Sequence, residues 1–482
     1  WRMIQRSHPP VFHPDRPDVI YALSWHGNRL VTTEDAGRTW RLLTEDTPWA
    51  GDRLSCFTLD RHDPARMLAA GTKSIYASGD GGETWRKLEG APAGVVALYV
   101  QSHGDGLDAL FAAAPEAVWC SEDGGERWER RTDGLPLRRD IRGFSGGWKP
   151  GQPHPVLYCV LPSREVDGGF EGGVYRSTDR AASWQSAMGE GINTALGKQD
   201  RWAPGPIDQF HLVSTVPDDP DRVFVCNTGT GYKPPYHYTL YGSTDGGDHW
   251  RDLLFTDPRF RRNNARVGWL FYERSRGYGG PALGMCVSAG DPSRLLYTNY
   301  GEVFLSVDGG AQWRQTYSTL ASKRRPGKGR RWQSIGLEDT SCWQYVVDPH
   351  DPTRHYICYT DIGFARSEDG GVYWFSATEG MPWRNTVYQL VCDPAVPGRL
   401  YAACSTQHDI PYWRSVRGPS GHGGVCVSRD AGANWRPLKD LPEAPVTSLY
   451  LDPASPVDAR MLLAGVYGHG VYRSEEIGRA HV

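Results

Sequence analysis

The feature that most constrains the fold is an octapeptide that recurs along the chain of 482 residues. Its pattern is Ser/Thr-x-Asp-x-Gly-x-x-Trp, as in residues 33–40 and 78–85. The aspartates of its copies are Asp35, Asp80, Asp123, Asp179, Asp245, Asp308, Asp369 and Asp430, spaced 45, 43, 56, 66, 63, 61 and 61 residues apart. An internal repeat of this period determines the architecture, so it takes precedence over local arguments about helices and strands.

The residue types of the octapeptide are those of a tight turn between two strands. An Asp side chain accepts hydrogen bonds from nearby backbone N–H groups, and Gly adopts a positive φ without steric cost. Trp then buries a large flat surface between neighbouring repeats. We therefore interpret these aspartates as structural. The copy at Asp179 has Ala181 in place of Gly, and we expect its turn to be the most strained.

Each repeat carries a second signature upstream of the octapeptide. An alternating apolar run ends near an Asp-Pro pair, such as Asp63-Pro64 or Asp393-Pro394, and a second apolar run follows. One repeat thus contains four short strands. Because 57 Gly and 35 Pro interrupt nearly every window long enough for a helix, the sequence predicts an all-β array of four-stranded propeller blades.

The blades are expected to belong to two tandem seven-bladed propellers in the intact protein. We assign residues 1–260 to an N-terminal propeller with a truncated first blade, because Trp1-Arg-Met-Ile4 resembles the fourth strands at 40–43 and 85–88. Residues 261–476 form a second propeller, in which a ninth octapeptide begins at 474 without its Asp and Trp. Residues 477–482 resemble the translation of a common sequencing adapter, so we interpret them as an artefact.

Composition excludes several classes of partner. With 53 Lys+Arg against 56 Asp+Glu the net charge is −3, so no general attraction for nucleic acid is expected. No apolar run approaches the roughly 20 residues that a membrane helix needs. The sequence shows no metal-ligand spacing. We expect a monomer without cofactor, metal or membrane span. The basic segment 323–331 is interpreted as a solvated loop, with contact to an acidic polymer as the alternative.

The ten cysteines include no CxxC pair, and almost all fall inside predicted strands. We interpret them as buried core residues. This pattern mildly favours a reducing compartment, although a disulfide such as Cys392–Cys404 stays open in an oxidising one.

The long connections fall at the end of each blade opposite the octapeptide turns. They span 131–155, 187–209, 228–240, 255–283, 316–341 and 405–423. Loops on a rigid scaffold commonly carry binding sites. These loops are rich in aromatic residues, which form either small loop cores or a platform on which sugar rings stack. The residues are Trp25, Trp49, Trp148, Trp202, Trp269, Trp332, Trp383, Trp413, Tyr232, Tyr236, Tyr238, Tyr278 and Tyr412.

Two carboxylates on this end are the candidate catalytic groups. Asp361 directly follows a predicted second strand, and Asp409 lies a few residues past the same point in the next repeat. Two carboxylates suit glycoside hydrolysis, with one acting as acid and one as a base that activates water. The alternative is that each Asp caps a local turn. The position of Asp361 does not demand Asp, because other repeats have Lys73, Glu116, Tyr300, Thr406 and Tyr467 there.

The octapeptides resemble the Asp-box (BNR) repeats of sialidase-like propellers over nearly the whole chain. Within it, 266–364 resembles the two-propeller xyloglucanases and oligoxyloglucan cellobiohydrolases, through Val267-Gly-Trp269, 295–301, Gly336-Leu-Glu-Asp-Thr340 and Thr360-Asp361-Ile-Gly363-Phe364. This resemblance implies inverting hydrolysis of a β-glucan-type polysaccharide or oligosaccharide, with Asp361 as the general acid.

The base is either Asp409 or the counterpart of the family's second catalytic aspartate. The motif that carries this second aspartate does not occur in the sequence outside Asp361. In the second case the chain is expected to be inactive alone. We place the substrate-binding residues around these carboxylates: Trp269, Trp332, Trp383, Arg384, Asn385, His408, Trp413 and Glu338.

Two other functions share these repeats. A non-catalytic propeller, similar to sortilin-type receptors or photosystem assembly factors, would bind a protein or a glycan, and Asp361 would then be structural. Sialidases resemble the chain less, because it has no Arg-Ile-Pro segment. Similarity to the xyloglucanases implies a secreted or periplasmic protein, whereas the cysteine pattern points mildly the other way.

Overall fold

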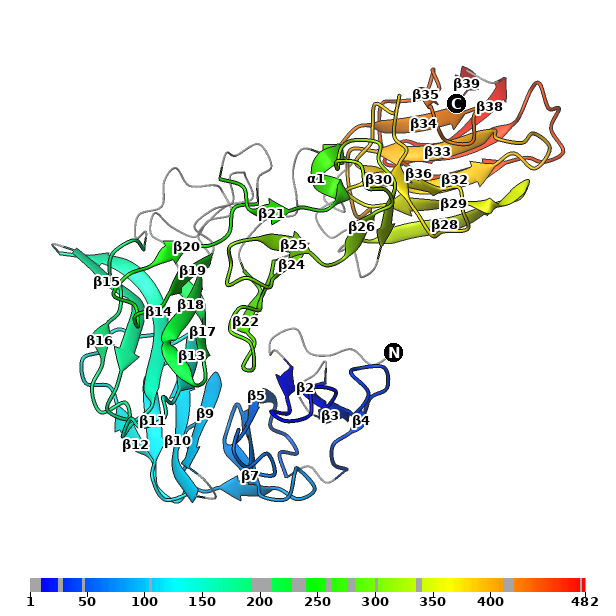
Figure 1. Cartoon of the computed structure of the whole chain (residues 1–482). Coiled ribbons are helices and arrows are strands. Elements are labelled where there is room, and N and C mark those ends of the chain that lie inside the picture. The colour runs from blue at the N-terminus through cyan, green and yellow to red at the C-terminus, as the bar shows by residue number, and fades with distance from the viewer. Residues whose placement is uncertain are drawn as a thin grey trace. The chain divides into compact units, whose positions relative to one another are not determined.

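The structure is a computed structural model. It describes residues 10–24, 29–45, 48–103, 106–167, 169–192, 210–227, 240–256, 262–274, 282–299, 302–334, 340–410, 420–476 and 479–481. The prediction of an all-β array of four-stranded antiparallel blades is confirmed (Figure 1). We number the blades 1 to 9 in chain order.

Blades 1 to 6 follow one another from residue 11 to residue 315. Blade 1 contains β1 (Val11–Phe12), β2 (Ile20–Leu23), β3 (Leu30–Thr33) and β4 (Arg41–Leu42), and blade 2 contains β5 (Leu54–Leu59), β6 (Met67–Gly71), β7 (Ile75–Ser78) and β8 (Arg86–Leu88). Blade 3 contains β9 (Ala97–His103), β10 (Gly106–Ala114), β11 (Ala117–Ser121) and β12 (Glu129–Arg131), and blade 4 contains β13 (Gly143–Gly147), β14 (Val156–Val166), β15 (Gly169–Ser177) and β16 (Gln185–Ser186). Blade 5 contains β17 (Phe210–Val216), β18 (Asp219–Asn227), β19 (Leu240–Ser243) and β20 (Arg251–Asp252), and blade 6 contains β22 (Gly284–Val287), β23 (Leu295–Thr298), β24 (Val303–Ser306) and β25 (Trp313–Gln315). Strand β21 (Ala265–Arg266) pairs in parallel with β25.

Blades 7 to 9 form the rest of the array. Blade 7 contains β28 (Cys342–Asp348), β29 (Asp351–Tyr359), β30 (Gly363–Ser367) and β31 (Phe375–Ser376). Blade 8 contains β32 (Thr386–Cys392), β33 (Leu400–Ser405), β34 (Gly423–Ser428) and β35 (Arg436–Pro437). Blade 9 contains β36 (Val446–Leu451), β37 (Leu462–Val466), β38 (Gly470–Glu476) and β39 (Arg479–His481). The hairpin β26 (Ser318–Leu320) and β27 (Trp332–Ser334) and the six-residue helix α1 (Trp269–Arg274) stand outside the blades. Sequence analysis did not predict this helix.

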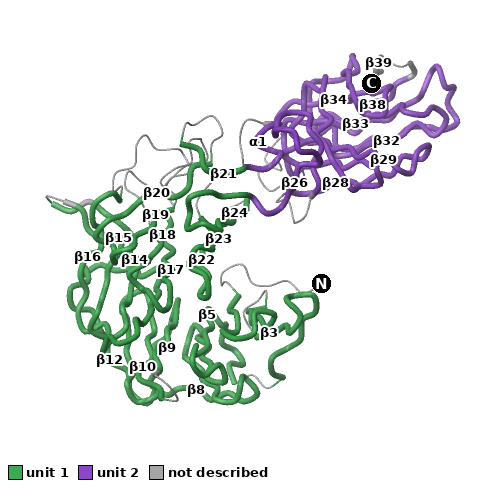
Figure 2. The backbone as a smooth tube through the Cα atoms, viewed as in Figure 1, with its two compact units in different colours: residues 1–266, 279–314 green, residues 267–278, 315–482 purple. Residues whose placement is uncertain are grey.

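The chain divides into two compact units (Figure 2). Unit 1 contains residues 1–266 and 279–314, and unit 2 contains residues 267–278 and 315–482. The predicted boundary after residue 260 differs from this division, because it separates blade 6 from blade 5. The structure keeps blade 6 in unit 1, where the Trp313 indole N–H donates to the Leu253 carbonyl of blade 5 at 2.9 Å. The completion of two seven-bladed propellers stays a prediction.

The octapeptide turns have the bonds that their residue types predict. In blade 2, Ser78 Oγ donates to Asp80 Oδ1 at 2.8 Å, and the Thr84 N–H donates to the same oxygen at 3.0 Å. The turn also attaches to the preceding blade, since a Cβ on Gly82 would lie 2.6 Å from Leu43 of blade 1. At Asp179, Arg180 and Ala181 both have positive φ, 58° and 64°, whereas every other turn has glycine at the second of these two positions. Two consecutive non-glycine residues in this region agree with the expected strain.

The two turn glycines of blade 2 provide a matched test of this packing. Gly81→Ala should cost about 1 kcal/mol, because Gly81 has φ +77° and a Cβ there meets nothing within 4 Å. Gly82→Ala should cost about 2–4 kcal/mol, because a similar backbone cost is joined by overpacking against Leu43. Urea unfolding measures both. Equal losses in the two variants would contradict the close contact between the turn and blade 1.

The turn aspartates should make the fold sensitive to acid. Hydrogen bonds from Thr39 and Thr33 lower the pKa of Asp35 to about 2, and bonds from Thr84 and Ser78 lower that of Asp80 to about 2. A pKa that is lower in the folded than in the unfolded chain stabilises the fold above the unfolded value near 4. This stability is lost as the pH falls from about 4 through 2. Thermal unfolding between pH 7 and pH 2 should show the loss, and Asp80→Asn should weaken its dependence on pH.

A second set of aspartates links the blades at the corner between the first and second strands. Asp60 and Asp393 have side chains with 0% exposure, and each pairs with an arginine six residues later, Arg66 or Arg399. Asp393 also binds Arg460 of blade 9 through two bonds, Nη2 to Oδ1 at 2.7 Å and Nε to Oδ2 at 3.0 Å. Sequence analysis noted the Asp-Pro pairs but missed this joint between blades.

The hydrophobic core lies between successive blades, as in the cluster that joins blades 2 and 3. Seven cysteines are buried, Cys392 is half-buried, and Cys286 and Cys342 are exposed, so the core interpretation holds for most but not all. A Cys392–Cys404 disulfide is not possible in this register. Cys392 pairs with Leu400, whereas Cys404 pairs with Val387.

Candidate functional site

Asp361 occupies the turn between β29 and β30 in unit 2. The Ile362 N–H donates to the Thr360 carbonyl at 2.7 Å across Asp361, and Asp361 has φ 63°. This is the hydrogen-bonding pattern of a γ-turn, whose form with positive φ is rare and strained. The octapeptide Asp369 of the same blade lies at the other end of β30. Asp361 is therefore separated from the octapeptide turn of blade 7.

Asp409 lies in the connection that follows β33 in the next blade, and the structure brings it close to the Asp361 turn. Thr360 Oγ1 donates to Asp409 Oδ1 at 3.4 Å, and His408 Nδ1 lies 2.8 Å from Asp409 Oδ2. Asp409 also has a positive φ, 54°. The predicted residues Asp361, His408 and Asp409 thus gather at one end of blades 7 and 8.

Tyr388 and Trp343 complete this cluster, and sequence analysis missed both. The Tyr388 hydroxyl donates to the Gln407 carbonyl at 2.8 Å and accepts the Ile410 N–H at 3.0 Å, so it fixes both ends of the segment that carries Asp409. The Trp343 ring lies 5.0 Å from the Tyr388 ring, and its indole N–H donates to Thr360. Trp343 was passed over because it falls inside a strand, yet it is 39% exposed.

The electrostatics of Tyr388 show that it lies near both carboxylates. Burial raises the pKa of Tyr388 above its ordinary value, the bond from Ile410 opposes this shift, and the charges of Asp409 and Asp361 add to it. Tyr388 is therefore a neutral hydroxyl at physiological pH. Its hydrogen bonds to Gln407 and Ile410 hold the segment that contains Asp409.

Trp269 and Trp332 are not the exposed sugar platform that we expected. They are only 8% and 5% exposed, and they form a small core with Ile362. Tyr272 stacks on Trp332 with ring centroids 6.1 Å apart. The interpretation as a loop core is therefore correct for these two residues, and for Trp49, which is 1% exposed. Because Ile362 is the neighbour of Asp361, this core supports the turn that holds the carboxylate.

Three further predicted residues, Trp383, Arg384 and Asn385, lie between β31 and β32. Trp383 is half-buried against Gly424, and its indole N–H donates to Glu443 at 3.5 Å. Arg384 is exposed and forms a parallel β-bridge with Ser405, and the Asn385 side chain accepts a hydrogen bond from Thr386.

Seven further predicted residues lie outside the described part of the chain: Glu338, Trp413, Trp25, Trp202, Tyr232, Tyr236 and Tyr238. The same is true of Tyr278 and Tyr412.

Among the described residues, no group of three or more His, Cys, Asp or Glu side chains could hold a metal ion. Within the same residues, no helix has the length and apolar character to cross a membrane.

Comparison with known proteins identifies the fold. No protein-family model matches the chain, and no curated protein matches its sequence. Among solved structures, an ancestral GH74 enzyme aligns over 98% of this chain with a TM-score of 0.66 and 16% identity. The GH74 xyloglucanase from Xanthomonas campestris aligns over 98% of this chain and 71% of its own, with a TM-score of 0.51 and 17% identity. The chain has the β-propeller fold of these GH74 enzymes.

The alignment covers only part of the first of these enzymes. The chain spans 62% of the length of the ancestral GH74 enzyme. A structure of YCF48 bound to a D1 peptide aligns over 78% of this chain with a TM-score of 0.42 and 14% identity.

Proposed function

We propose that the chain is part of a glycoside hydrolase that acts on a β-glucan-type polysaccharide such as xyloglucan. Asp361 donates a proton to the oxygen of the leaving sugar. Asp409 is the base that accepts a proton from the attacking water, which bonds to the anomeric carbon as the glycosidic bond breaks. The half-exposed ring of Trp343 offers a face for a sugar beside them.

The observation that carries the proposal is the backbone of the two carboxylates. Outside the octapeptide turns, only three described non-glycine residues have positive φ, and they are Asp361, Asp409 and Asp440. The two candidates chosen from sequence are thus both held in a sparsely populated conformation. Such strain persists where surrounding structure enforces it, and it is concentrated at functional sites. The chain shares its fold with GH74 enzymes, and the proposal extends their glycoside hydrolase chemistry to this chain.

A specific observation also favours a second function, a non-catalytic glycan-binding propeller. Both oxygens of Asp409 already contact Thr360 or His408, which suits a carboxylate that holds a loop in place. In that case the cluster binds a sugar chain without cleaving it. The aromatic ring of Trp343 would contribute to either function.

The two functions are separated by assaying the chain on a panel of soluble β-glucans that includes xyloglucan. Release of reducing ends, with inverted anomeric configuration in proton NMR, supports the hydrolase. Retardation in xyloglucan-containing gels that Trp343→Ala removes, without any release of reducing ends, supports the binder. A folded chain that neither cleaves nor binds any glucan of the panel contradicts both.

A further inference from the structure

The hairpin of β26 and β27 in unit 2 carries a dense group of positive charges. Residues 321–331 connect the two strands and contain six Lys or Arg side chains and no Asp or Glu. Sequence analysis interpreted the basic part of this segment as a solvated loop. We call residues 318–334 the basic hairpin and ask how the structure holds its charges.

The basic hairpin is attached to blade 7. The Trp332 N–H donates to the Trp374 carbonyl at 2.7 Å, and the Trp374 N–H donates to the Trp332 carbonyl at 2.6 Å. Trp332 also packs against Ile362 in the small core described above. The Ala321 N–H donates to the Arg331 carbonyl at 2.9 Å, so the pairing of the hairpin continues beyond β26. The cations are therefore carried by a paired hairpin that packs on a blade.

Two of the six cations have acidic partners in unit 2. The Arg331 guanidinium pairs with Glu368, which precedes the octapeptide Asp of blade 7. Lys328 Nζ lies 3.6 Å from Glu379 Oε2, in the connection that follows β31. These two pairs hold the hairpin in place, and their charges are balanced within the protein.

The other four cations form no ion pair with any residue that the structure describes. They are Lys323, Arg324, Arg325 and Arg330. The first three are exposed and the fourth is half-buried. A third glutamate, Glu273 of α1, also reaches the hairpin, where it accepts the Gly329 backbone N–H at 2.5 Å. Six cations thus face three glutamates, and the hairpin keeps an excess of positive charge.

The side chains of the hairpin restrict the kind of partner that this charge can bind. A guanidinium group binds a carboxylate through two parallel hydrogen bonds. Proteins that bind single-stranded nucleic acids add aromatic side chains on which the bases stack, and membrane anchors add large apolar side chains. Residues 321–331 contain neither kind. An acidic polysaccharide requires neither, because its carboxylates project from the sugar rings.

We propose that the basic hairpin binds an acidic polysaccharide, a polymer whose sugar units carry carboxylate groups. Lys323, Arg324 and Arg325 bind the carboxylates from the limb that follows β26, and Arg330 binds them from the limb that precedes β27. The proposal does not depend on glucan hydrolysis, since none of these cations belongs to the cluster of Asp361 and Asp409.

Calorimetric titration of the whole chain with polygalacturonate at low ionic strength tests the proposal. Saturable binding is expected, and added salt should weaken it because the cations are exposed. Lys323→Gln, Arg324→Gln and Arg325→Gln, introduced together, should weaken binding by about 10-fold or more, since three exposed ionic contacts are lost at once. The melting temperature should not change, because Lys328 and Arg331 still attach the hairpin.

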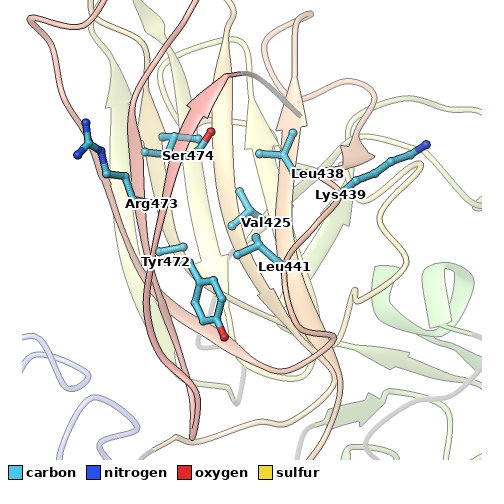
Figure 3. Close-up of a pocket in the computed structure, with 9 residues that line it drawn as sticks. Val425, Leu438, Lys439, Leu441, Tyr472, Arg473 and Ser474 are labelled. Carbon is cyan, nitrogen blue, oxygen red and sulfur yellow. The ribbon is translucent and has the colours of Figure 1, made fainter. Parts of the chain in front are cut away.

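Arg429→Gln, Arg436→Gln and Lys439→Gln, introduced together, form the matched control. These are also two arginines and one lysine, and all three are exposed on blade 8 of the same unit. Lys439 extends away from the pocket that Leu438 and Leu441 line (Figure 3). The control variant has the same net charge as the test variant, and it should bind polygalacturonate like the unaltered chain.

Three results would overturn the proposal. One is the absence of polygalacturonate binding by the unaltered chain. Another is an equal loss of binding in the two triple variants, which would indicate a general effect of charge. The third is binding of a single-stranded oligonucleotide, or of phosphatidylserine vesicles, that is as tight as binding of polygalacturonate and is lost in the hairpin variant. That result would assign the hairpin to another class of partner.

Discussion

Replacement of Asp393 by alanine is expected to lower the free energy of unfolding of unit 2 by about 3–5 kcal/mol. The carboxylate is fully buried between Arg460, which is 1% exposed, and Arg399, which is 15% exposed. Without it, both guanidinium groups would lose the carboxylate with which they pair. Since Arg460 belongs to blade 9 and Asp393 to blade 8, the substitution should weaken the joint between two blades.

The measurement is urea unfolding of the whole chain, with Asp351→Asn as the matched control. Asp351 is also an aspartate at a blade corner paired with an arginine, Arg354, at 3.0 Å, but its side chain is 36% exposed. An exposed pair of this kind contributes about 0–1 kcal/mol. Equal losses in Asp393→Ala and Asp351→Asn would contradict the importance of the buried joint.

Asp361→Asn is expected to lower the rate of glucan hydrolysis by about 10²–10⁴-fold if the proposed function holds. The amide keeps the shape of the side chain and tolerates the positive φ, but it cannot donate a proton as an acid. The rate of release of reducing ends from xyloglucan, at saturating substrate, measures the effect. The melting temperature should change little.

Asp440→Asn is the matched control for this substitution. Asp440 has φ 64° and is exposed in the connection after β35, outside the carboxylate cluster. The same change of chemical group at the same backbone conformation should leave the rate unchanged. A similar loss in both variants, or full activity in Asp361→Asn, would show that Asp361 is not the acid.

The sequence predicted the blades well because their determinants are local. The octapeptide needs only a hydroxyl, a carboxylate and a glycine at fixed spacing, and these residues make their bonds within four positions of one another, as Ser78, Asp80 and Thr84 do. The joints between blades were not predicted. Asp393 and Arg460 lie 67 residues apart in the chain, and nothing in the local pattern around either residue indicates the other.

The candidate site was predicted in part for the same reason. Asp361 stood out as a carboxylate directly after a second strand, and Asp409 as one a few residues past the same point in the next repeat. The structure brings their turns together through Thr360. Exposure could not be read from residue type, so Trp269 and Trp332 were taken as a binding platform although tertiary packing buries them under Ile362. Trp343 was overlooked because strand residues of a closed blade are ordinarily covered, and exposure depends on the neighbours of β28 rather than on its own pattern.

The innermost strands of unit 2 share one further connection. The Leu390 N–H donates to Gln344 Oε1 at 2.6 Å, and the Leu449 N–H donates to Gln389 Oε1 at 2.7 Å, so each blade repeats the same side-chain bond to the next. A blade cannot open without releasing an amide of its neighbour. Hydrogen–deuterium exchange should therefore report these two amides in a single protection class, and the three blades should melt as one cooperative body.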